Sequence, residues 1–410
     1  MTDLHRPKGT TDILPPESSR WRNAHRVFDD LAERFGFDLV LTPIFEHTEV
    51  FSRGVGQDTE VVEKQMYTFS DQSGRSLTLR PEATASVVRA AIQAGGSSSF
   101  KAAYWGPMFR YERPQHGRRR QFYQGGVEYL GSASPDADVE VIEFGYRYLE
   151  AMGVPDVDVH LNSIGDPADR ATYRKQITAF LRSKESQLSD DAVRRIDTNP
   201  MRVLDSKADV EVVRDAPVPI DHLGTEASDH FEAVKSGLAA VGVPFSIEDK
   251  LVRGLDYYNR TVFEYVPAGY EAAQSAVGGG GRYDGLFEML GGKPNPAVGL
   301  SMGIDRILQA GGEGPDSPSL DVFVVVVHES LRTDATVLVS TLRQAGLRAD
   351  MPDEHRSVTA QFKEANRRGS MGAVVVGDEW SDGEVTVRDL VSGTQQVVGT
   401  KEIARWVDTL

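Results

Sequence analysis

The sequence predicts an α+β protein in which strand-rich segments surround a helical insertion and a smaller α/β segment follows. Three observations support this prediction. Residues 101–130 show the alternation of two paired strands, and a strand pattern returns at 251–265. Between about 167 and 240, charged residues interleave with helically spaced apolar ones, and strand signals are weak. Beyond residue 319, helices and strands alternate over about ninety residues, which is typical of a small domain with a mixed sheet.

The composition excludes several kinds of functional site. The chain has 410 residues, enough for two or three domains, and it contains no cysteine. Disulfides, thiolate catalysis and cysteine-ligated zinc or iron–sulfur sites are therefore excluded. The nine histidines show no paired ligand spacing, so we expect no metal site built by the protein alone. The net charge of −16 argues against indiscriminate coating of nucleic acid, whereas a specific partner can still dock on local basic patches.

No segment has the pattern of a membrane span or an export signal. The N-terminal residues are polar and lack the apolar stretch of a secretory signal. The longest apolar run, 322–327, is far too short to cross a bilayer. We therefore expect a cytoplasmic protein that does not associate with membranes.

The first two predicted elements are a helix and an edge strand. The helix covers 17–36, where apolar residues recur at helical spacing and Gly36 ends the pattern. The strand covers 38–44 and is interrupted by Pro43. Because proline has no N–H to donate to a neighbouring strand, this strand should lie at a sheet edge or at an interface that a partner subunit covers.

A hairpin and a second helix follow. Strands at 65–70 and 76–80 are joined by a turn, and a helix rich in small residues runs through 85–94. Glu82 and Thr84 stand where the strand turns into the helix, so two interpretations are open. A carboxylate there can receive a substrate ammonium group, or the two side chains simply cap the helix. The residues alone do not favour either interpretation.

The central hairpin, 101–130, carries an unusual polar face. Arg110 on the outgoing strand can share one sheet face with Gln124 and Glu128 on the returning strand, because side chains alternate with a period of two. The glycine pair 125–126 should leave room for a ligand against the backbone. Such a face is costly to bury unless its groups pair with each other or with a ligand. A surface hairpin with a solvated arginine tip is the alternative, and we slightly favour the ligand site.

The middle of the chain predicts a helix at 137–153, the helical insertion and then further strands. The basic residues of the insertion favour a solvated helix face, with RNA contact as the alternative. A glycine-rich strand and turn at 278–285 match neither a dinucleotide-binding fingerprint nor a P-loop. These glycines would let a flat ligand approach the backbone closely. A last strand, 298–302, runs into a helix that carries Arg306.

Residues 310–319 have the composition of a linker. The segment beyond it contains no phosphate loop and no cluster of catalytic side chains, so we expect it to be a binding module. Its predicted elements are strands at 321–327, 347–351 and 372–377, helices at 333–345, 357–368 and 401–409, and a hairpin at 384–399.

Five stretches resemble known motifs. The segment around Pro43, the hairpin from FRYER to GGVEY, and VGLSMGIDRI around Arg306 resemble motifs 1, 2 and 3 of the class II aminoacyl-tRNA synthetases. The blocks RGLDYYNRTVFE (253–264) and GGRYDGL (280–286) are similar to the pair peculiar to the histidyl-tRNA synthetase family. Five motifs in the right order argue against coincidence. The resemblance covers nearly the whole chain and implies a class II catalytic domain, 1–318, and an anticodon-binding α/β domain, 319–410.

The resemblance implies an antiparallel sheet core flanked by helices rather than a Rossmann sheet. It also implies a two-step reaction. The carboxylate of L-histidine attacks the α-phosphate of ATP and releases pyrophosphate, and the histidyl group then passes from the adenylate to the 3′ end of tRNA(His). Motif 1 implies a homodimer formed through the region around Pro43.

The same resemblance assigns residues to the ATP site. Arg110 and Arg253 would stabilise the charge that develops on the α-phosphate, and Glu112 would also contact ATP. Arg306 would hold the triphosphate, with Mg²⁺ on the phosphate oxygens. Three neighbouring guanidinium groups repel one another, so without ATP we expect them to be mobile or paired with carboxylates.

Histidine selection needs a donor and an acceptor at fixed separation. A site that bonds a substrate's polar groups rejects analogues lacking them by roughly 10⁴–10⁵, so no editing domain is needed. The resemblance places seven side chains around histidine: Glu82, Thr84 and Gln124 at the amino group, Glu128 and Tyr258 at the ring, and Tyr257 and Tyr283 in the wall. Ala83 departs from the glycine that many members have, which leaves the local backbone path open.

The tRNA contacts implied by the resemblance lie in two places. The motif 2 loop would meet the acceptor end through Arg113, Gln115, Arg118 and Arg120. The C-terminal domain would bind the anticodon, through splayed single-stranded bases.

Two alternatives belong to other functional classes. A regulatory subunit of ATP phosphoribosyltransferase keeps this catalytic fold and binds histidine without charging tRNA, but it lacks the anticodon domain and tends to lose the RGLDYY block. A synthetase for threonine, proline or glycine shares a similar C-terminal domain. The RGLDYY block argues against it, and so does the absence of a Cys or His set for the zinc used in threonine selection.

Overall fold

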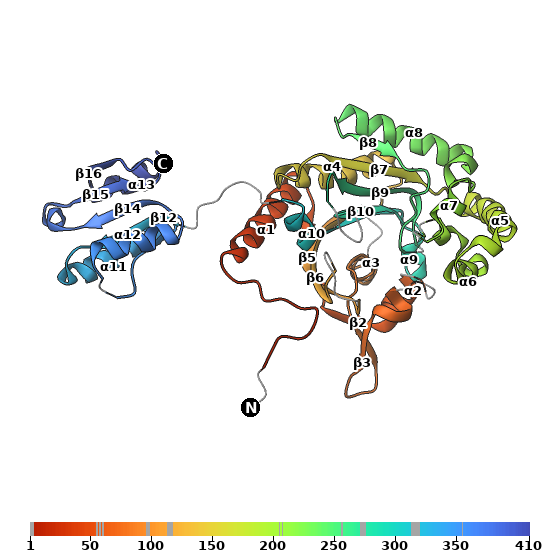
Figure 1. Ribbon diagram of the computed structural model, residues 1–410, viewed down its shortest axis with the longest axis horizontal. Coiled ribbons are helices and arrows are strands. Elements are labelled where there is room, and N and C mark those ends of the chain that lie inside the picture. The colour runs from red at the N-terminus through yellow and green to blue at the C-terminus, as the bar shows by residue number, and fades with distance from the viewer. Residues whose placement is uncertain are drawn as a thin grey trace. The chain divides into compact units, whose positions relative to one another are not determined.

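The computed structural model describes residues 4–410 except 55, 57, 58, 60, 96–98, 113–117, 205, 207, 256, 271–275, 313–319 and 355. The chain divides into two compact units, Met1–Pro315 and Asp316–Leu410, and each is described by itself (Figure 1). The domain boundary predicted between residues 318 and 319 lies outside the described residues.

An eight-stranded sheet forms the centre of the first unit, in the order β1-β5-β6-β11-β10-β9-β7-β8. Neighbours from β5 to β7 pair antiparallel, whereas the two edge pairs, β1–β5 and β7–β8, are parallel. The predicted antiparallel core is therefore confirmed. The strands are β1 (Asp38–Leu39), β5 (Phe100–Phe109), β6 (Gln121–Leu130), β7 (Val157–Ser163), β8 (Phe245–Ile247), β9 (Asn259–Pro267), β10 (Gly278–Arg282) and β11 (Ala297–Gly303).

β5 and β6 form the predicted central hairpin. Regular pairing ends at Phe109, and the Arg110 N–H donates one further hydrogen bond to the Arg120 carbonyl at 3.0 Å. On its other side β6 pairs with β11, which places Glu128 opposite Gly299. The hairpin therefore contributes one strand to the middle of the sheet, where a polar face can be buried.

The strand predicted over 38–44 is wrong in its length. Both residues of β1 pair with β5, and one further hydrogen bond runs from the Val40 N–H to the Ala103 carbonyl at 2.8 Å. The chain then leaves the sheet near Pro43, which has no N–H with which to continue the ladder. The buried guanidinium of Arg80 fastens this crossing by donating to the Thr42 carbonyl at 3.1 Å. β1 does lie at the sheet edge, as predicted.

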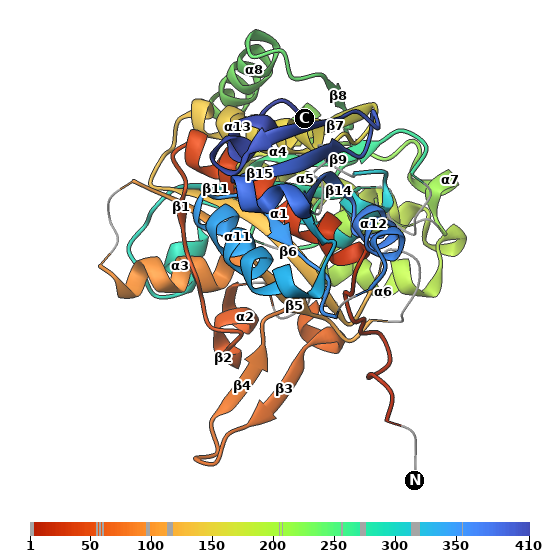
Figure 2. The same cartoon turned by 90° about the vertical axis from the view of Figure 1, so that its left-hand side faces the viewer.

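A second, three-stranded sheet follows in the order β2-β4-β3, formed by β2 (Phe45–His47), β3 (Tyr67–Ser70) and β4 (Ser76–Leu79). The predicted hairpin is β3–β4, and it projects from the unit (Figure 2). Around it lie α2 (Thr48–Gly54), the short π-helix Val61–Gln65 and α3 (Thr84–Gln93). Because α3 directly follows β4, Glu82 and Thr84 do stand at a strand-to-helix junction.

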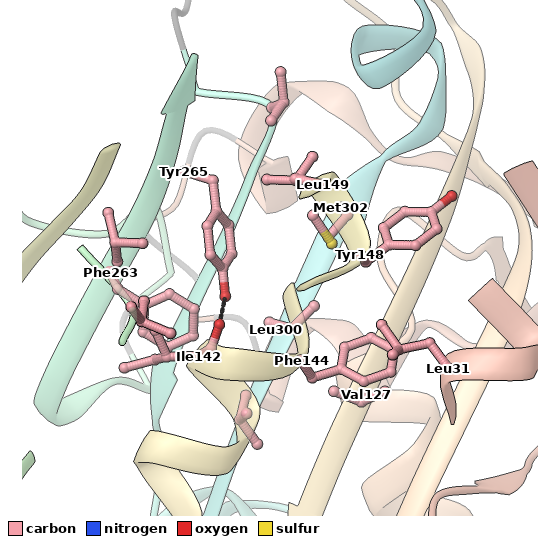
Figure 3. Packing of buried hydrophobic residues seen from close by; sticks show 14 of the residues in the cluster. Leu31, Val127, Ile142, Phe144, Tyr148, Leu149, Phe263, Tyr265, Leu300 and Met302 are labelled. Carbon is pink, nitrogen blue, oxygen red and sulfur yellow. Dashed lines mark hydrogen bonds between the residues drawn. The ribbon is translucent and has the colours of Figure 1, made fainter. Parts of the chain in front are cut away.

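Helices α1 (Glu17–Arg34), α4 (Pro135–Ala151) and α8 (Thr225–Ala240) pack on one face of the large sheet. Figure 3 shows this core, in which the Tyr265 hydroxyl of β9 donates to the Ile142 carbonyl of α4 at 2.8 Å. A side chain at Gly145 of α4 would overlap the Tyr265 ring, so the close approach of helix and sheet requires glycine there. This face is closed by packing and leaves the opposite face for the site.

The opposite face meets α3 and a helical segment between β7 and β8. The described helices of this segment confirm the helical character predicted for 167–240: α5 (Pro167–Ser183), Glu185–Gln187, α6 (Asp190–Thr198), Pro200–Val203, α7 (Val210–Val213), Pro219–His222 and α8. Its apolar side chains, such as Tyr173 and Ile177, share one core cluster with Tyr257, Tyr258 and Tyr283. The helices from α5 to α7 therefore pack against the side of the sheet that carries the predicted site, whereas α8 packs on the other face. α9 (Leu286–Met289) and α10 (Ile304–Gln309) follow β10 and β11.

The second unit contains a five-stranded mixed sheet, in the order β13-β12-β14-β15-β16. β12 is parallel to both β13 and β14, and β14–β15–β16 are antiparallel. α11 and α13 cover one face and α12 covers the other, as predicted for a small α/β domain. The elements are β12 (Leu320–Val326), α11 (Arg332–Gln344), β13 (Ala349–Asp350), α12 (Val358–Arg367), β14 (Ser370–Val376), β15 (Glu384–Asp389), β16 (Gln395–Gly399) and α13 (Ile403–Val407), with single 3-10 turns at Glu329–Leu331, Asp378–Asp382 and Thr400–Glu402.

Two features are absent from the described residues. None of their helices combines the length and the apolar character that a membrane crossing requires. Nor do three or more of their His, Asp or Glu side chains gather into a group that would hold a metal ion.

Candidate functional site

A cavity of about 350 Å³ opens on the face of the large sheet formed by β6, β10 and β11. Its other walls come from the start of α3, the residues just beyond β5, the segment 251–258 and the start of α10. Segments far apart in the sequence therefore converge on one space. The predicted site residues that line it are Glu82, Thr84, Arg110, Glu112, Arg118, Gln124, Arg253, Tyr257, Tyr258, Tyr283 and Arg306.

Of the four remaining predicted residues, two are described and do not line the cavity. Arg113 and Gln115 fall outside the described residues. The Arg120 guanidinium stacks on the Tyr111 ring, 4.0 Å from its centroid. Glu128 is completely buried directly behind the wall, where two lining residues bond its carboxylate.

Three guanidinium groups meet at the phosphate end predicted for the cavity. Arg253 forms an ion pair with Glu264, and pairing with a carboxylate is one of the two arrangements expected for these arginines. Arg110 and Arg306 are held differently, because Arg110 Nε donates to the Pro81 carbonyl at 2.9 Å and Arg306 Nη1 donates to the Ala276 carbonyl at 3.0 Å. Backbone carbonyls orient these cations without neutralising them.

Burial shifts the pKa values of these arginines. Burial lowers the pKa of Arg110 and of Arg306. The carboxylates of Glu112 and Glu82 oppose this effect at Arg110, whereas the Arg110 guanidinium adds to it at Arg306. Burial also acts to lower the pKa of Arg253, but the Glu264 carboxylate and the adjacent tyrosines outweigh it, so that pKa is raised. Arginines stay charged in proteins, so the cavity holds several positive charges in a poorly hydrated space. A polyphosphate is the kind of ligand that such a site stabilises.

Glu82 has contacts that are compatible with both interpretations that the sequence left open. Its carboxylate accepts a hydrogen bond from the Ala85 N–H at 3.1 Å and so caps α3, while the residue also lines the cavity. Burial raises the pKa of Glu82, against the hydrogen bonds that lower it. Thr84 does not cap the helix, since its hydroxyl donates to Glu128 Oε1 at 2.6 Å.

Glu128 is the most enclosed acid of the site. Thr84 and Tyr283 both donate hydrogen bonds to its carboxylate. Burial nevertheless raises the pKa of Glu128 to about 8, and the nearby Glu82 charge adds to the effect. Thr84 and Tyr283 therefore connect a buried acid to the cavity, which suits recognition of a ring that carries both a donor and an acceptor.

The raised pKa of Glu128 predicts a stability that falls with pH. Between its ordinary pKa of 4.5 and about 8, the folded protein holds the Glu128 proton more tightly than the unfolded chain does. The free energy of unfolding should therefore decrease as pH rises through this window, and the contribution of Glu128 should be constant below and above it. Urea unfolding at pH 5 and pH 8 should show a larger loss for the wild type than for Glu128→Gln. The exposed Glu33→Gln is the control, and identical pH profiles for wild type and Glu128→Gln would contradict the expectation.

The role predicted for the glycine pair 125–126 is wrong. A side chain at Gly126 would overlap the Tyr104 hydroxyl, and one at Gly125 would come within 2.9 Å of the Trp105 ring. Protein aromatic groups, rather than a ligand, fill the space that these glycines leave. Gly299 leaves room for a site residue instead, because a methyl group there would overlap the Glu128 carboxylate. Gly281 does the same for Tyr258, whose ring would lie 2.8 Å from a methyl group at that position.

Three features of the site were not predicted from the sequence. Tyr104 lines the cavity, and extending the alternation of Arg110 and Met108 back along β5 would have found it. Glu264 stands at the end of the RGLDYYNRTVFE block, but nothing local indicates its pairing with Arg253. Asp305, next to Arg306, accepts from Arg119 Nη1 at 2.6 Å and from the Tyr123 N–H at 3.0 Å, which fastens the start of α10.

Comparison with known families gives matches along most of the chain. A family model described as "Histidyl-tRNA synthetase" matches residues 9–307, and one described as "Anticodon binding domain" matches residues 321–410. The chain is 45% identical over 413 residues to the "Histidine--tRNA ligase" of Desulforudis audaxviator, covering 98% of this chain and 97% of that protein.

Solved structures give the same picture. The chain resembles the crystal structure of apo S. aureus histidyl-tRNA synthetase with a TM-score of 0.78 and 33% identity, over 99% of this chain and 100% of that chain. It also resembles a Bacillus halodurans structure described as "an ATP phosphoribosyltransferase regulatory subunit/histidyl-tRNA synthetase", with a TM-score of 0.65 and 21% identity, over 91% of this chain and 98% of that chain. The second likeness concerns the fold alone.

Proposed function

The chain belongs to the histidyl-tRNA synthetase family, whose activity is histidine–tRNA ligation, and on this premise we propose that the described cavity is where L-histidine and ATP react. One observation carries this proposal. Three guanidinium groups and a buried carboxyl with hydroxyl neighbours line or adjoin the same cavity of about 350 Å³. The first set suits a triphosphate and the second suits a small polar ring.

The adenylation step follows from the charges in the cavity. A carboxylate oxygen of histidine attacks the α-phosphorus of ATP, the bond to the bridging oxygen breaks, and pyrophosphate leaves with the electron pair. Arg110 and Arg253 would stabilise the negative charge that develops on the α-phosphoryl oxygens. Glu112 lines the same end of the cavity, and Arg306 would hold the β- and γ-phosphates.

Magnesium would arrive on the phosphate oxygens of ATP. Mg²⁺ commonly binds one or two protein carboxylates together with substrate phosphates and waters. Glu112, Glu264 and Asp305 line the cavity together with Arg110, Arg253 and Arg306, so the donor set fits an ion carried by the substrate. The ion would supply charge neutralisation on the phosphates. Release of Glu264 from Arg253 would then free both groups for their ligands.

The histidine end of the cavity would select by hydrogen bonding. Glu82, Thr84 and Gln124 would surround the amino group, and Gln124 Nε2 lies 3.4 Å from the Ser301 hydroxyl. Glu128 and Tyr258 would bond the imidazole. Tyr257 and Tyr283 would form the wall, where their ring centroids are 5.5 Å apart. A substrate that lacks the ring nitrogens would leave these buried polar groups unpaired.

The tRNA(His) contacts and the assembly are also proposals. The loop residues Arg113, Gln115, Arg118 and Arg120 would meet the acceptor end, and the second unit would bind the anticodon, with domains at 1–318 and 319–410. A homodimer through the region around Pro43 is supported by apolar side chains exposed there, with Leu39 62% and Leu41 77% exposed. The protein would work in the cytoplasm.

The decisive experiment is ATP–pyrophosphate exchange with each amino acid in turn. Exchange that depends on histidine and on magnesium is expected, followed by histidylation of tRNA(His) when tRNA is added. Histidine binding without exchange would overturn the proposal and favour a regulatory subunit. Exchange with threonine, proline or glycine would favour another synthetase.

A further inference from the structure

The backbone at Arg260 has an unusual conformation. Its φ of 49° lies in the left-handed region, which within the described residues it shares with one other non-glycine residue, Asp156. A side chain with a Cβ adopts this region only at a cost in free energy, so the surrounding structure must hold it there. Arg260 lies in β9, two residues after Tyr258 of the proposed histidine pocket.

The unusual conformation coincides with a β-bulge. The pairing of β10 with β9 steps from Gly281 opposite Val262 to Arg282 opposite Asn259, which leaves Arg260 and Thr261 as extra residues. A bulge redirects the strand and the side chains beside it. Tyr258 directly precedes Asn259, the paired residue before the bulge. Tyr283 directly follows Arg282, the partner of Asn259 on β10. The direction of both pocket tyrosines therefore depends on the bulge.

Two side-chain pairs fasten the residues next to these tyrosines, one between the two segments and one between β10 and α4. Asn259 Nδ2 donates to Asp284 Oδ2 at 2.9 Å, and the Asp284 N–H donates to Asn259 Oδ1 at 2.8 Å. Arg282 is fully buried and forms an ion pair with the equally buried Asp138 of α4. These contacts hold the flanks of the bulge, but neither of them holds Arg260 itself.

Arg260 is held by the start of the helical segment. Its Nε and Nη2 donate to the two oxygens of Asp166 at 2.7 Å and 2.9 Å, an arrangement that fixes the guanidinium in one orientation. Its backbone N–H donates to the Gly165 carbonyl at 2.9 Å, and its carbonyl accepts from the Ile164 N–H at 2.9 Å. Asp166 caps α5, the first helix of the segment.

The last helix of the segment reaches the same place. Arg260 Nη1 lies 3.4 Å from His230 Nδ1 of α8, and His230 Nε2 lies 3.4 Å from Asp138 Oδ1. In addition, Arg170 Nη1 of α5 donates to the Tyr258 carbonyl at 2.6 Å. Both ends of the helical segment therefore contact the bulge or the residues that flank it.

We propose that Arg260 is a positioning residue for histidine recognition, and that through its pair with Asp166 the helical segment holds Tyr258 and Tyr283 in place. Arg260 does not line the cavity, so it acts through the backbone and not on the substrate. The inference rests on the proposed histidine pocket. It differs from the ATP contacts, because the arginines of the phosphate end are anchored to Pro81, Glu264 and Ala276 instead.

Arg260→Ala and Arg260→Gly separate the backbone role from the loss of a side chain. Both remove the ion pair, but glycine adopts a positive φ at little cost whereas alanine does not. In ATP–pyrophosphate exchange, we expect Arg260→Ala to raise the KM for histidine on the order of tenfold, with the KM for ATP changed less than about twofold. Arg260→Gly should recover a clear part of the histidine KM. Asp166→Asn weakens the pair but keeps a capping side chain, so it should raise the histidine KM and leave the ATP KM unchanged. It provides the test if Arg260→Ala does not fold.

The control uses the other left-handed residue. Asp156→Ala and Asp156→Gly should change the melting temperature without changing the KM for histidine relative to the KM for ATP. The inference is overturned if the Arg260 variants raise both KM values equally, or if glycine and alanine at 260 give the same histidine KM. Tyr283→Phe tests the pocket separately. If Tyr283→Phe changes the histidine KM and Arg260→Ala does not, the role of Arg260 is refuted and the proposed pocket stands. If neither Tyr283→Phe nor Tyr258→Phe changes the histidine KM, the proposed pocket is refuted.

Discussion

Replacing Arg253 with alanine is expected to lower the kcat of histidine-dependent ATP–pyrophosphate exchange on the order of 10²–10³-fold, the usual effect of removing one donor that stabilises transition-state charge. Arg253 lines the cavity and forms an ion pair with Glu264, which lines it too. Histidine binding, measured by calorimetry without ATP, should change little. The loss should therefore appear in kcat and not in histidine affinity.

Three further variants show whether position or charge matters at Arg253. Arg253→Lys keeps the charge but loses the planar fork, so it should recover only part of the rate. Arg147→Ala removes an arginine from an ion-paired cluster on the surface of α4 and should leave exchange unchanged. Because Arg253→Ala leaves the Glu264 carboxylate without its cation, Arg253→Ala/Glu264→Gln shows whether that charge contributes to the loss. Exchange at the wild-type rate in Arg253→Ala would remove this residue from the reaction.

Replacing Gly299 with alanine should damage histidine binding. The added methyl group would overlap the Glu128 carboxylate, and the Val127 carbonyl at 2.9 Å limits movement of the strand. Glu128 would have to leave its hydrogen bonds with Thr84 and Tyr283, and each lost bond to a buried polar group costs about 1–3 kcal/mol. We expect the histidine KM to rise about tenfold to a hundredfold, with a stability loss of about 1–3 kcal/mol from overpacking.

Gly285→Ala is the matched control for this change. No atom lies within 4 Å of the position that its methyl group would take, and its φ of −83° is accessible to alanine. Exchange kinetics and urea unfolding of the two variants should therefore differ sharply. A histidine KM for Gly299→Ala equal to that of Gly285→Ala would show that Glu128 does not take part in recognition.

Local patterns predicted most elements because they repeat over short distances. The period of two in the central hairpin placed Arg110, Gln124 and Glu128 on one face, and β5 and β6 have that pairing. Helical spacing predicted α1 to within two residues at its C-terminal end. The wrong length at 38–44 has the same origin, since the apolar run 39–41 reads as strand although the pairing with β5 ends at Leu39 and one further bond from Val40.

The sequence by itself determined the family, the antiparallel core and the residue types of the site, because these depend on short motifs and on side-chain periodicity. The tertiary structure alone decided which partner each group meets. Glu128 lies behind the cavity wall, Gly299 rather than Gly126 makes room for it, and Glu264 pairs with Arg253. It also brought Asp166 to Arg260 across 94 positions of sequence. Such pairings depend on how the whole chain packs, and no local pattern records the distance between two residues that only folding brings together.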